Sequence, residues 1–442
     1  MSNSQWKLYT SVFRCPVLTS DAQAGSSWIG FYKSVGDARK MGLKGFVLFV
    51  MRFNPAALSI ALLATVSAHD AHEALLERDL APPVAVNDGS YTNCASAAWP
   101  PSNVGVELVP QAPTGEVTAM LDEISPANIE AIITKLVSFG TRHTLATFNS
   151  STRGIHAARD WIASEMKPKS TIILAAVAGE EQGLYGAGYL AGTLKNSSTN
   201  VEGMLNCDIV GSSTGDRGQK DPFTIRAFAQ GPPPSESAAK AAQRLQIGGE
   251  NDSPARELAR FSAEVAGNNA TGMNVAIIYR LDRFLRGGDH TPFLQNGFPA
   301  IRYTEPNENF AHQHQDLRTE NGTVYGDLID FVDFDYTARV GKVNMATIWA
   351  LSESPGMPRN VTVDTTVLDN DTRLKWIVSN HTNVAGYEVV WRPVANSLWT
   401  HQVDVGKVGS VTLPLSKDNV IFGVRAVGTN GYKSPAVYPF PG

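Results

Sequence analysis

The segment from Thr171 to Leu190 restricts the possible folds of this 442-residue chain more narrowly than its overall composition does. Thr171 to Val177 is a continuous apolar run with β-branched residues, which predicts a short strand buried on both faces of a sheet. Gly179 breaks the run, and the small residues and amphipathic spacing after it predict a helix that begins near Gln182. A buried strand followed by a helix is typical of an α/β fold.

The acidic pair Glu180 and Glu181 follows this strand directly, at the carboxyl end where open α/β sheets bind their ligands. Two carboxylates there can divide the work, one coordinating a metal and the other taking a proton from the metal-bound water. The alternative is a solvated acidic turn, because acidic residues are mostly exposed and helix N-termini favour negative charge. The pair alone favours that alternative, so its assignment depends on the surrounding sequence.

Four motifs decide this question in favour of a metal site. In chain order they are A-G-E-E-Q-G-L-Y-G around Glu180, M-L-N-C-D-I-V-G around Asp208, R-G-G-D-H-T-P-F, and T-E-P-N-E-N-F-A-H-Q-H-Q-D. Together they resemble the two-zinc aminopeptidase family, which includes secreted leucyl aminopeptidases and glutamate carboxypeptidases. The resemblance covers roughly Ile124 to Ala350 in the family's order, which makes a chance match improbable. It implies an α/β class, with a three-layer α/β/α zinc-exopeptidase fold around a mixed central sheet.

The resemblance also implies a role for each matching residue. Glu180 would be the general base, while Glu181, Asp208 and His312 would be zinc ligands. The family's last His ligand is followed four positions later by an acidic residue, and His312 with Asp316 fits that spacing.

The sequence leaves open the roles of three other residues in these motifs. His314 would then be a solvated loop histidine. Asp289 and His290 resemble a pair that lines the substrate pocket in the family, and they could equally form a structural turn.

The resemblance is interrupted after Met166. The family has strands there that carry a His-x-Asp turn, followed by a loop with a Gly-x-Asn-Asp type motif; the His binds one zinc and the Asp of the second motif bridges both. Here the chain passes through Lys167–Ser170 directly into the Thr171 strand, and neither motif occurs elsewhere. A catalytic zinc usually needs three protein ligands, so the two zinc ions of the family become one or none in this chain. The loss would also leave sheet edges unpaired.

The N-terminal part resembles an export signal. If translation begins at Met51, then Arg52 is the positive region, Ala56 to Val66 is the apolar region and the cleavage site ends at Ala68. We therefore predict an unassigned upstream extension at 1–50, a signal peptide at 51–68, and a propeptide or N-terminal arm at 69–117. The alternative for 51–68 is a signal anchor.

Export also fits the many N-x-Ser/Thr sequons, which predict a glycosylated extracellular protein. They lie at Asn149, Asn196, Asn251, Asn269, Asn321, Asn360, Asn370 and Asn380. If the leader is removed with Cys15, Cys94 and Cys207 remain; they could form a disulfide, or Cys207 could be a free buried thiol.

Helical spacing predicts the remaining elements of a peptidase domain at 118–351. We expect two helices separated by a cap at Ser125–Pro126, a helix from about Thr152 to Met166, and a long closing helix from Val324 to Leu351. The loop residue His143 is expected to be structural rather than a ligand. A linker rich in Pro and Gly follows at 352–358.

After the linker, at 359–442, the apolar residues alternate with period two, which predicts an all-β sandwich. This part resembles a fibronectin type III domain, with Trp376 in its core, Tyr387 to Trp391 as a central strand and Phe422 where the corner tyrosine is usual. It would be an accessory module that contacts a cell wall, a glycan or a protein.

These observations predict a secreted zinc-dependent aminopeptidase that acts on peptides or proteins. The alternative is a secreted binding protein on a peptidase scaffold, because the ligand motifs after Met166 are missing. The formal net charge of -5 gives no basic surface for nucleic acid, and no membrane contact is expected after signal cleavage.

Overall fold

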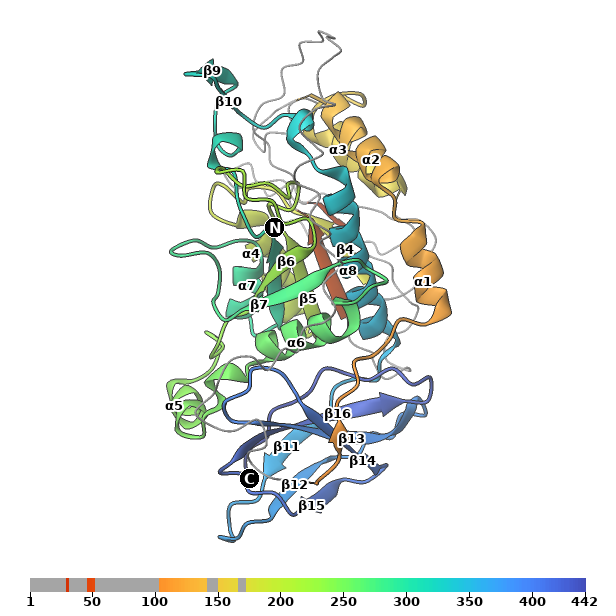
Figure 1. The fold of residues 1–442 in the computed structure, drawn as a ribbon, viewed down its shortest axis with the longest axis vertical. Coiled ribbons are helices and arrows are strands. Elements are labelled where there is room, and N and C mark those ends of the chain that lie inside the picture. Colours follow the sequence, from red (N-terminus) through yellow and green to blue (C-terminus); the bar gives the residue numbers. More distant parts are fainter. Residues whose placement is uncertain (1–28, 32–45, 52–102, 141–149, 166–171) are drawn as a thin grey trace, which may run out of the picture.

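The computed structural model describes residues 29–31, 46–51, 103–140, 150–165 and 172–442, which form an α/β domain and a β-sandwich (Figure 1). A seven-stranded sheet with the order β1-β4-β2-β5-β8-β6-β7 forms the centre of the α/β domain. Its strands are β1 (Ile29–Phe31), β2 (Phe46–Met51), β4 (Ile172–Ala176), β5 (Val201–Cys207), β6 (Thr224–Phe228), β7 (Asn274–Ile278) and β8 (Ala300–Thr304). The sheet is mixed, because β1 pairs with β4 and β6 pairs with β8 in antiparallel directions.

Helices cover both faces of this sheet, and each face has its own apolar core. One core involves α1 (Gly115–Asp122), α6 (Pro254–Ala266) and α8 (Phe334–Glu353), and the other involves α4 (Tyr185–Asn196) and α7 (His290–Gln295). Three further helices are α2 (Pro126–Ser138), α3 (Gly154–Glu165) and α5 (Ala238–Gln246). The predicted three-layer α/β/α class with a mixed sheet is confirmed.

The strand predicted at Thr171 to Val177 is β4, but the helix after it begins at Tyr185 rather than near Gln182. The residues between them form a tight turn, in which the backbone N–H groups of Gly183 and Leu184 donate to the carbonyl of Glu180 at 3.0 and 2.9 Å. Leu184 has a φ of 61°, in the left-handed region, so the helix cannot start before it.

The closing helix is shorter at its start than predicted, because α8 begins at Phe334 and not at Val324. A hairpin of β9 (Arg318–Glu320) and β10 (Thr323–Tyr325) precedes it, and Gly326 has a φ of 112°. The Asp333 side chain then caps the helix by accepting from the Tyr336 backbone N–H at 2.9 Å. Leu328, Phe331 and Val332, which matched the helical spacing, lie in and beside the short helix η4 (Ile329–Phe331), between the hairpin and α8. The predicted cap at Ser125 is confirmed, since its hydroxyl accepts from the Asn128 N–H at 3.2 Å.

Strand β2 of this sheet comes from an unexpected part of the chain. β2 lies between β4 and β5 and runs parallel to both, although its residues belong to the region before the predicted signal peptide cleavage site. It pairs along its whole length with β5, from Phe46 opposite Val201 to Met51 opposite Cys207. β4 and β5 are therefore separated by the width of one strand, and the expected unpaired edges do not occur between them.

The C-terminal part is a sandwich of two four-stranded sheets, in the orders β15-β12-β11-β17 and β16-β13-β14-β3. Trp376 is buried in its core, and Tyr387 to Trp391 belong to the inner strand β13, as predicted. The strands are β11 (Arg359–Val363), β12 (Thr372–Ile377), β13 (Val384–Pro393), β14 (His401–Gly406), β15 (Ser410–Leu413), β16 (Val420–Gly428), β17 (Phe440–Pro441) and β3 (Val106–Glu107). β3 comes from the segment between β2 and α1.

Several predictions concern residues outside the described ranges: the leader after Met51, Cys94, His143 and the junction from Met166 to Thr171. Cys207 is a free buried thiol that accepts a hydrogen bond from Asn344 Nδ2 at 3.0 Å. Its burial raises the thiol pKa to about 12. No helix within the described ranges is long and apolar enough to span a membrane.

Candidate functional site

The acidic residues predicted to form the site lie along one edge of the central sheet. β4, β2, β5 and β8 are parallel, so their carboxyl ends meet at the same edge. Glu180 and Glu181 follow β4 in the tight turn described above, and Asp208 follows β5 directly. Glu180 is half-buried and Glu181 is exposed. This edge is where doubly wound sheets carry ligand sites.

Asp208 is buried and forms an ion pair with a buried arginine of β8. Its side chain is 2% exposed, and its Oδ2 lies 3.2 Å from Arg302 Nη2. Arg302 Nη1 in turn lies 2.6 Å from Oδ2 of Asp282, and both of these side chains are fully buried. One guanidinium therefore faces two carboxylates, and in this structure it supplies the positive charge beside Asp208.

The backbone immediately after Asp208 is in an unfavourable conformation. Ile209 has a φ of 59°, which is rare for a β-branched residue. Its carbonyl accepts hydrogen bonds from the Glu305 N–H at 2.8 Å and from the Thr304 hydroxyl at 3.0 Å. β8 thus holds the turn that presents Asp208, which is the situation in which local strain persists at functional sites.

A cavity of about 150 Å³ opens beside this turn. Its lining includes Asp208, Glu305, His312, His314 and Asp327, so the structure brings residues from the ends of β5 and β8 and from the following loop to one place. Glu180 and Glu181 are not part of its lining, but Glu181 reaches it through His314. Oε1 of Glu181 lies 3.6 Å from Nε2 of His314.

The two candidate histidines have different surroundings. His312 ends the short helix η3 (Phe310–His312), and its ring stacks on Phe331 with a centroid distance of 3.6 Å and an interplanar angle of 2°. Burial lowers the pKa of His312 from its ordinary value, which favours the neutral imidazole that can bind a metal. His314 is exposed, as predicted for a solvated loop histidine, and it is the histidine that contacts Glu181.

Glu305 also belongs to the site. It lies within one of the four motifs, but no role was predicted for it. It is 3% exposed and accepts a hydrogen bond from the Ser212 N–H at 2.8 Å. Burial raises its pKa to about 8, so the carboxyl group is protonated at neutral pH. Its position directly after the buried strand β8 is the same signal that identified Asp208 after β5, and could have revealed it.

Asp289 and His290 are buried at the start of α7, and neither lines the cavity. His290 Nε2 lies 2.8 Å from the Leu281 carbonyl, so this nitrogen carries the proton, and burial lowers the pKa of the ring to about 4. His290 Nδ1 and both amide atoms of the buried Asn206 have no hydrogen-bond partner in the described part of the chain. A Cβ on Gly288 would lie 3.3 Å from Asn206 Nδ2 and 3.4 Å from His290 Nδ1, so these two atoms approach the same point.

The described residues do not fit a zinc ion. They contain no group of three or more His, Cys, Asp or Glu side chains that could hold a metal. Asp208 faces Arg302, and His312 stacks on Phe331, so the three expected ligands Glu181, Asp208 and His312 do not converge. A zinc site would need at least one further ligand at this edge.

Comparisons with known sequences identify a family of enzymes. Residues 154–324 match the sequence profile of Peptidase family M28. A probable zinc metalloprotease of Pyrenophora tritici-repentis is 64% identical over an alignment that takes in 89% of this chain and 100% of that protein. Another from Leptosphaeria maculans is 66% identical and takes in 77% and 100%. The LapA aminopeptidase of Legionella pneumophila is a structural neighbour with 14% identity, a TM-score of 0.34 and coverage of 57% and 78%.

The length of the first alignment is itself informative. It runs over 486 positions, more than the 442 residues of this chain, although only 89% of the chain takes part. The Pyrenophora tritici-repentis protein therefore contains residues that have no counterpart in this chain.

Proposed function

The chain belongs to peptidase family M28, whose matched relatives are named zinc metalloproteases, and we propose that it derives from a secreted exopeptidase that hydrolyses N-terminal peptide bonds. Its substrates are peptides or proteins. Glu180 is the general base, which takes the proton of the attacking water and passes it to the leaving amine. Glu181, Asp208 and His312 match zinc ligands of the family in the sequence, although they do not converge in this structure.

One observation carries this proposal: the acidic turns after β4 and β5 lie at the same edge, with one strand between them. Val50 of β2 lies opposite Ala175 in β4, and Met51 lies opposite Cys207, the residue before Asp208. Whatever follows a strand in this position must therefore lie between Glu181 and Asp208. A ligand there could approach both carboxylates.

We further propose that this position belongs to the segment that is missing after Met166. In the resemblance described above, that segment supplies strands, a His-x-Asp turn and a bridging Asp. The surplus positions in the Pyrenophora tritici-repentis alignment support a loss of this kind. With the segment present, two zinc ions would have complete ligand sets; in the chain as written, no zinc-dependent step can be assigned.

Sequencing the transcript across the codons of Met166 and Lys167 tests this proposal. We expect an in-frame insert that encodes a strand ending in a His-x-Asp turn, followed by a second Asp. The chain with that insert should hydrolyse an aminoacyl chromogenic substrate, and Glu180→Gln should abolish the hydrolysis. The proposal would be wrong if the insert restored zinc binding but the Glu180→Gln variant kept full activity.

A second function is favoured by the lack of a three-ligand group among the described residues. If every transcript reads directly from Met166 to Lys167, the protein is a secreted binding protein on a peptidase scaffold. It would then take up no zinc, and Glu180→Gln would leave its ligand binding unchanged.

Secretion is part of the proposal and rests on the predicted leader at 51–68 together with the sequons. Every sequon asparagine within the described residues is exposed, as attachment of a glycan requires. The exposed set is Asn196, Asn251, Asn269, Asn321, Asn360, Asn370 and Asn380. Expression in a eukaryotic host should give a glycosylated protein in the medium; an unglycosylated protein retained in the cell would contradict secretion.

A further inference from the structure

The β-sandwich is connected to the α/β domain by more than the linker at 352–358. β3 lies between β2 and β4 in the sequence, two strands of the α/β sheet, yet it pairs with β14 of the sandwich, with Glu107 opposite His401 and Val106 opposite Gln402. The segment around β3 makes further bonds to the sandwich on both sides of this pairing. They are Trp391 Nε1 to the Val104 carbonyl at 3.0 Å, the Leu108 N–H to the Thr400 carbonyl at 2.9 Å, and the Lys433 N–H to Gln111 Oε1 at 2.9 Å. The sandwich is thus completed by residues from the other end of the chain.

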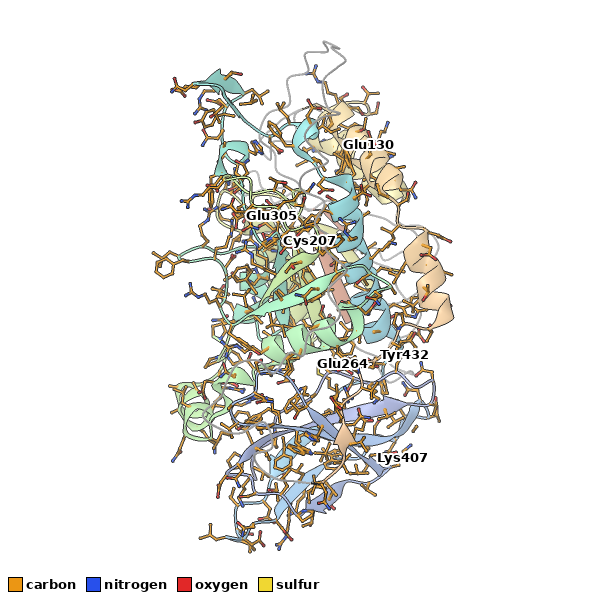
Figure 2. The ribbon with its side chains drawn as sticks, viewed as in Figure 1. Glu130, Cys207, Glu264, Glu305, Lys407 and Tyr432 are labelled. Atoms are coloured by element: carbon orange, nitrogen blue, oxygen red, sulfur yellow. The ribbon has the colours of Figure 1, made fainter. Side chains whose placement is uncertain are left out.

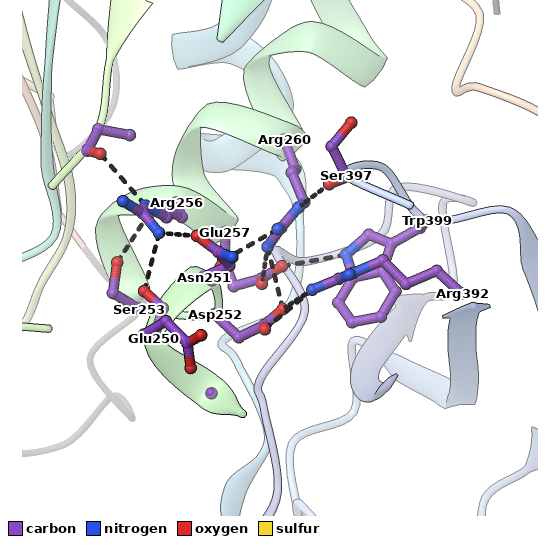
Figure 3. A network of polar contacts seen from close by, with 12 residues as sticks. Glu250, Asn251, Asp252, Ser253, Arg256, Glu257, Arg260, Arg392, Ser397 and Trp399 are labelled. Atoms are coloured by element: carbon purple, nitrogen blue, oxygen red, sulfur yellow. Dashed lines mark hydrogen bonds and ion pairs between the residues drawn. The ribbon is translucent and has the colours of Figure 1, made fainter. Parts of the chain in front are cut away.

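The contact between the domains contains buried charges that are matched across it (Figure 3). Asp252 precedes α6 and is 2% exposed; its two carboxylate oxygens accept from Arg392 Nη2 of β13 at 2.8 and 2.9 Å. Oδ1 of Asp252 also lies 3.2 Å from Arg260 Nη1 of α6. Because Arg260 and Arg392 are buried as well, each charge depends on a partner in this contact.

The neighbouring glutamate of α6 is bound in the same way. Glu257 forms an ion pair with Arg260 within the helix and accepts from Trp399 Nε1 of the sandwich at 3.0 Å. Arg260 Nε donates to the Ser397 carbonyl of the sandwich at 2.8 Å. Without the sandwich, Glu257 would lose its tryptophan donor and Arg260 its carbonyl acceptor.

A second cluster of charges extends the contact along α6. Glu264 accepts from Arg425 Nη1 of β16 at 2.9 and 3.0 Å, and Arg425 is 2% exposed. Arg425 Nε also donates to Glu388 Oε2 at 2.8 Å, and Lys433 Nζ lies 2.7 Å from Glu388 Oε1. Glu264 of α6 and Asp252 just before α6 therefore meet arginines of the sandwich at two separate places, so the two surfaces are complementary in charge.

We propose that the β-sandwich is an obligate part of the peptidase fold, held by β3 and by the buried charges of α6, rather than a module tethered by the linker. This inference is independent of the proposed catalytic activity. It also limits the accessory role expected from the sequence. The β13 and β16 side is occupied by the α/β domain, so an external partner of the sandwich would have to bind the other sheet, β15-β12-β11-β17.

Cutting the linker tests the proposal on the complete chain. Gly356 is exposed within the linker, so a specific protease site can be inserted after it. After cleavage, verified on a denaturing gel, we expect both fragments to co-elute in gel filtration and to unfold in one thermal transition. Release of the C-terminal fragment under native conditions, or two separate transitions, would overturn the proposal.

Two matched variants separate the buried charges from the rest of the contact. Arg392→Gln removes a buried charge of the interface, and we expect it to release the C-terminal fragment after cleavage. Lys375→Gln removes an exposed charge from the other sheet, and its fragments should stay together. Retention of the fragment in both variants would contradict the role given to the buried charges. If Arg392→Gln does not fold, the cleaved unsubstituted chain still decides the question.

Discussion

The two ends of the α/β domain hold their buried polar groups in opposite ways. Figure 2 labels Glu305 near the candidate site and Glu264 next to the sandwich, at separate ends of the domain. At the sandwich, Asp252 and Glu257 each accept hydrogen bonds from both domains. At the candidate site, Asn206 and His290 leave polar atoms without a partner in the described part of the chain.

This difference in hydrogen bonding distinguishes a structural contact from an incomplete site. Buried polar groups in folded proteins are almost always hydrogen-bonded, because an unmade bond costs about 1–3 kcal/mol. The carboxylates of Asp252 and Glu257 obey this rule, although Nε of Arg392 has no hydrogen-bond partner among the described residues. The exceptions near Asp208 lie where the family resemblance indicates that a segment is missing.

The largest expected effect concerns the catalytic base. In the chain with the missing segment restored, Glu180→Gln should lower kcat by roughly 10²- to 10⁴-fold, because general base catalysis contributes about that factor. The free energy of unfolding should change by less than about 0.5 kcal/mol, since Glu180 is half-buried at a turn. Kinetics and urea unfolding of the same preparation measure both. An equal loss of activity and stability would mean that Glu180 is structural.

The second largest expected effect is a loss of stability at the contact with the sandwich. Asp252→Asn leaves Arg260 and Arg392 facing a neutral group, and removal of one member of a buried charge network costs about 3–5 kcal/mol. Urea unfolding measures this loss. The control is Asp369→Asn on the exposed pair with Arg373, which should cost less than about 1 kcal/mol. Similar losses in the two variants would remove the contrast between interface and surface.

A pH-dependent effect on stability is expected from Glu305. Glu305 has its pKa raised from 4.5 to about 8 by burial, so between these values the folded state keeps a proton that the unfolded state releases. Stability therefore falls as pH rises through this window. Glu305→Gln should flatten the fall by a few kcal/mol, at about 1.4 kcal/mol per pKa unit. Unfolding at pH 5, 6.5 and 8 measures the slope, and an unchanged slope would show that Glu305 ionises normally.

The smallest expected effect is a gain in the stability of the fold. Asn206→Leu removes a buried amide that has no partner among the described residues, so it should stabilise the fold by about 1 kcal/mol. Asn344→Leu is the control, because the Asn344 amide donates to Cys207 and to the Val340 carbonyl and its loss should destabilise by about 1 kcal/mol. Thermal unfolding measures both. A destabilised Asn206→Leu would show that this amide has a partner in solution.

Much of the fold could be predicted because its periodic elements are local. The apolar run before Gly179 and the alternation around Trp376 and Tyr387 matched the strands β4, β12 and β13. The predicted start of α8 was wrong, since the apolar residues of the separate short helix η4 continue the helical spacing of α8. β2 and β3 could not be predicted, because each pairs with a strand that lies more than a hundred residues away in the sequence.

The site was predicted only as far as single residues follow strands or match motifs. Glu181 and Asp208 were found in this way, and Glu305 could have been. The pairing of Arg302 with Asp208, and of Arg392 with Asp252, depends on folding and leaves no local pattern. In the sequence these arginines are ordinary members of strands.

The metal content of the purified chain, measured with and without the missing segment, tests the central claim most directly. Elemental analysis after dialysis should find no stoichiometric zinc in the 442-residue chain, because its described residues offer no three-ligand group. The chain with the segment restored should retain two zinc ions. Stoichiometric zinc in the chain as written would contradict the claim that its ligand set is incomplete.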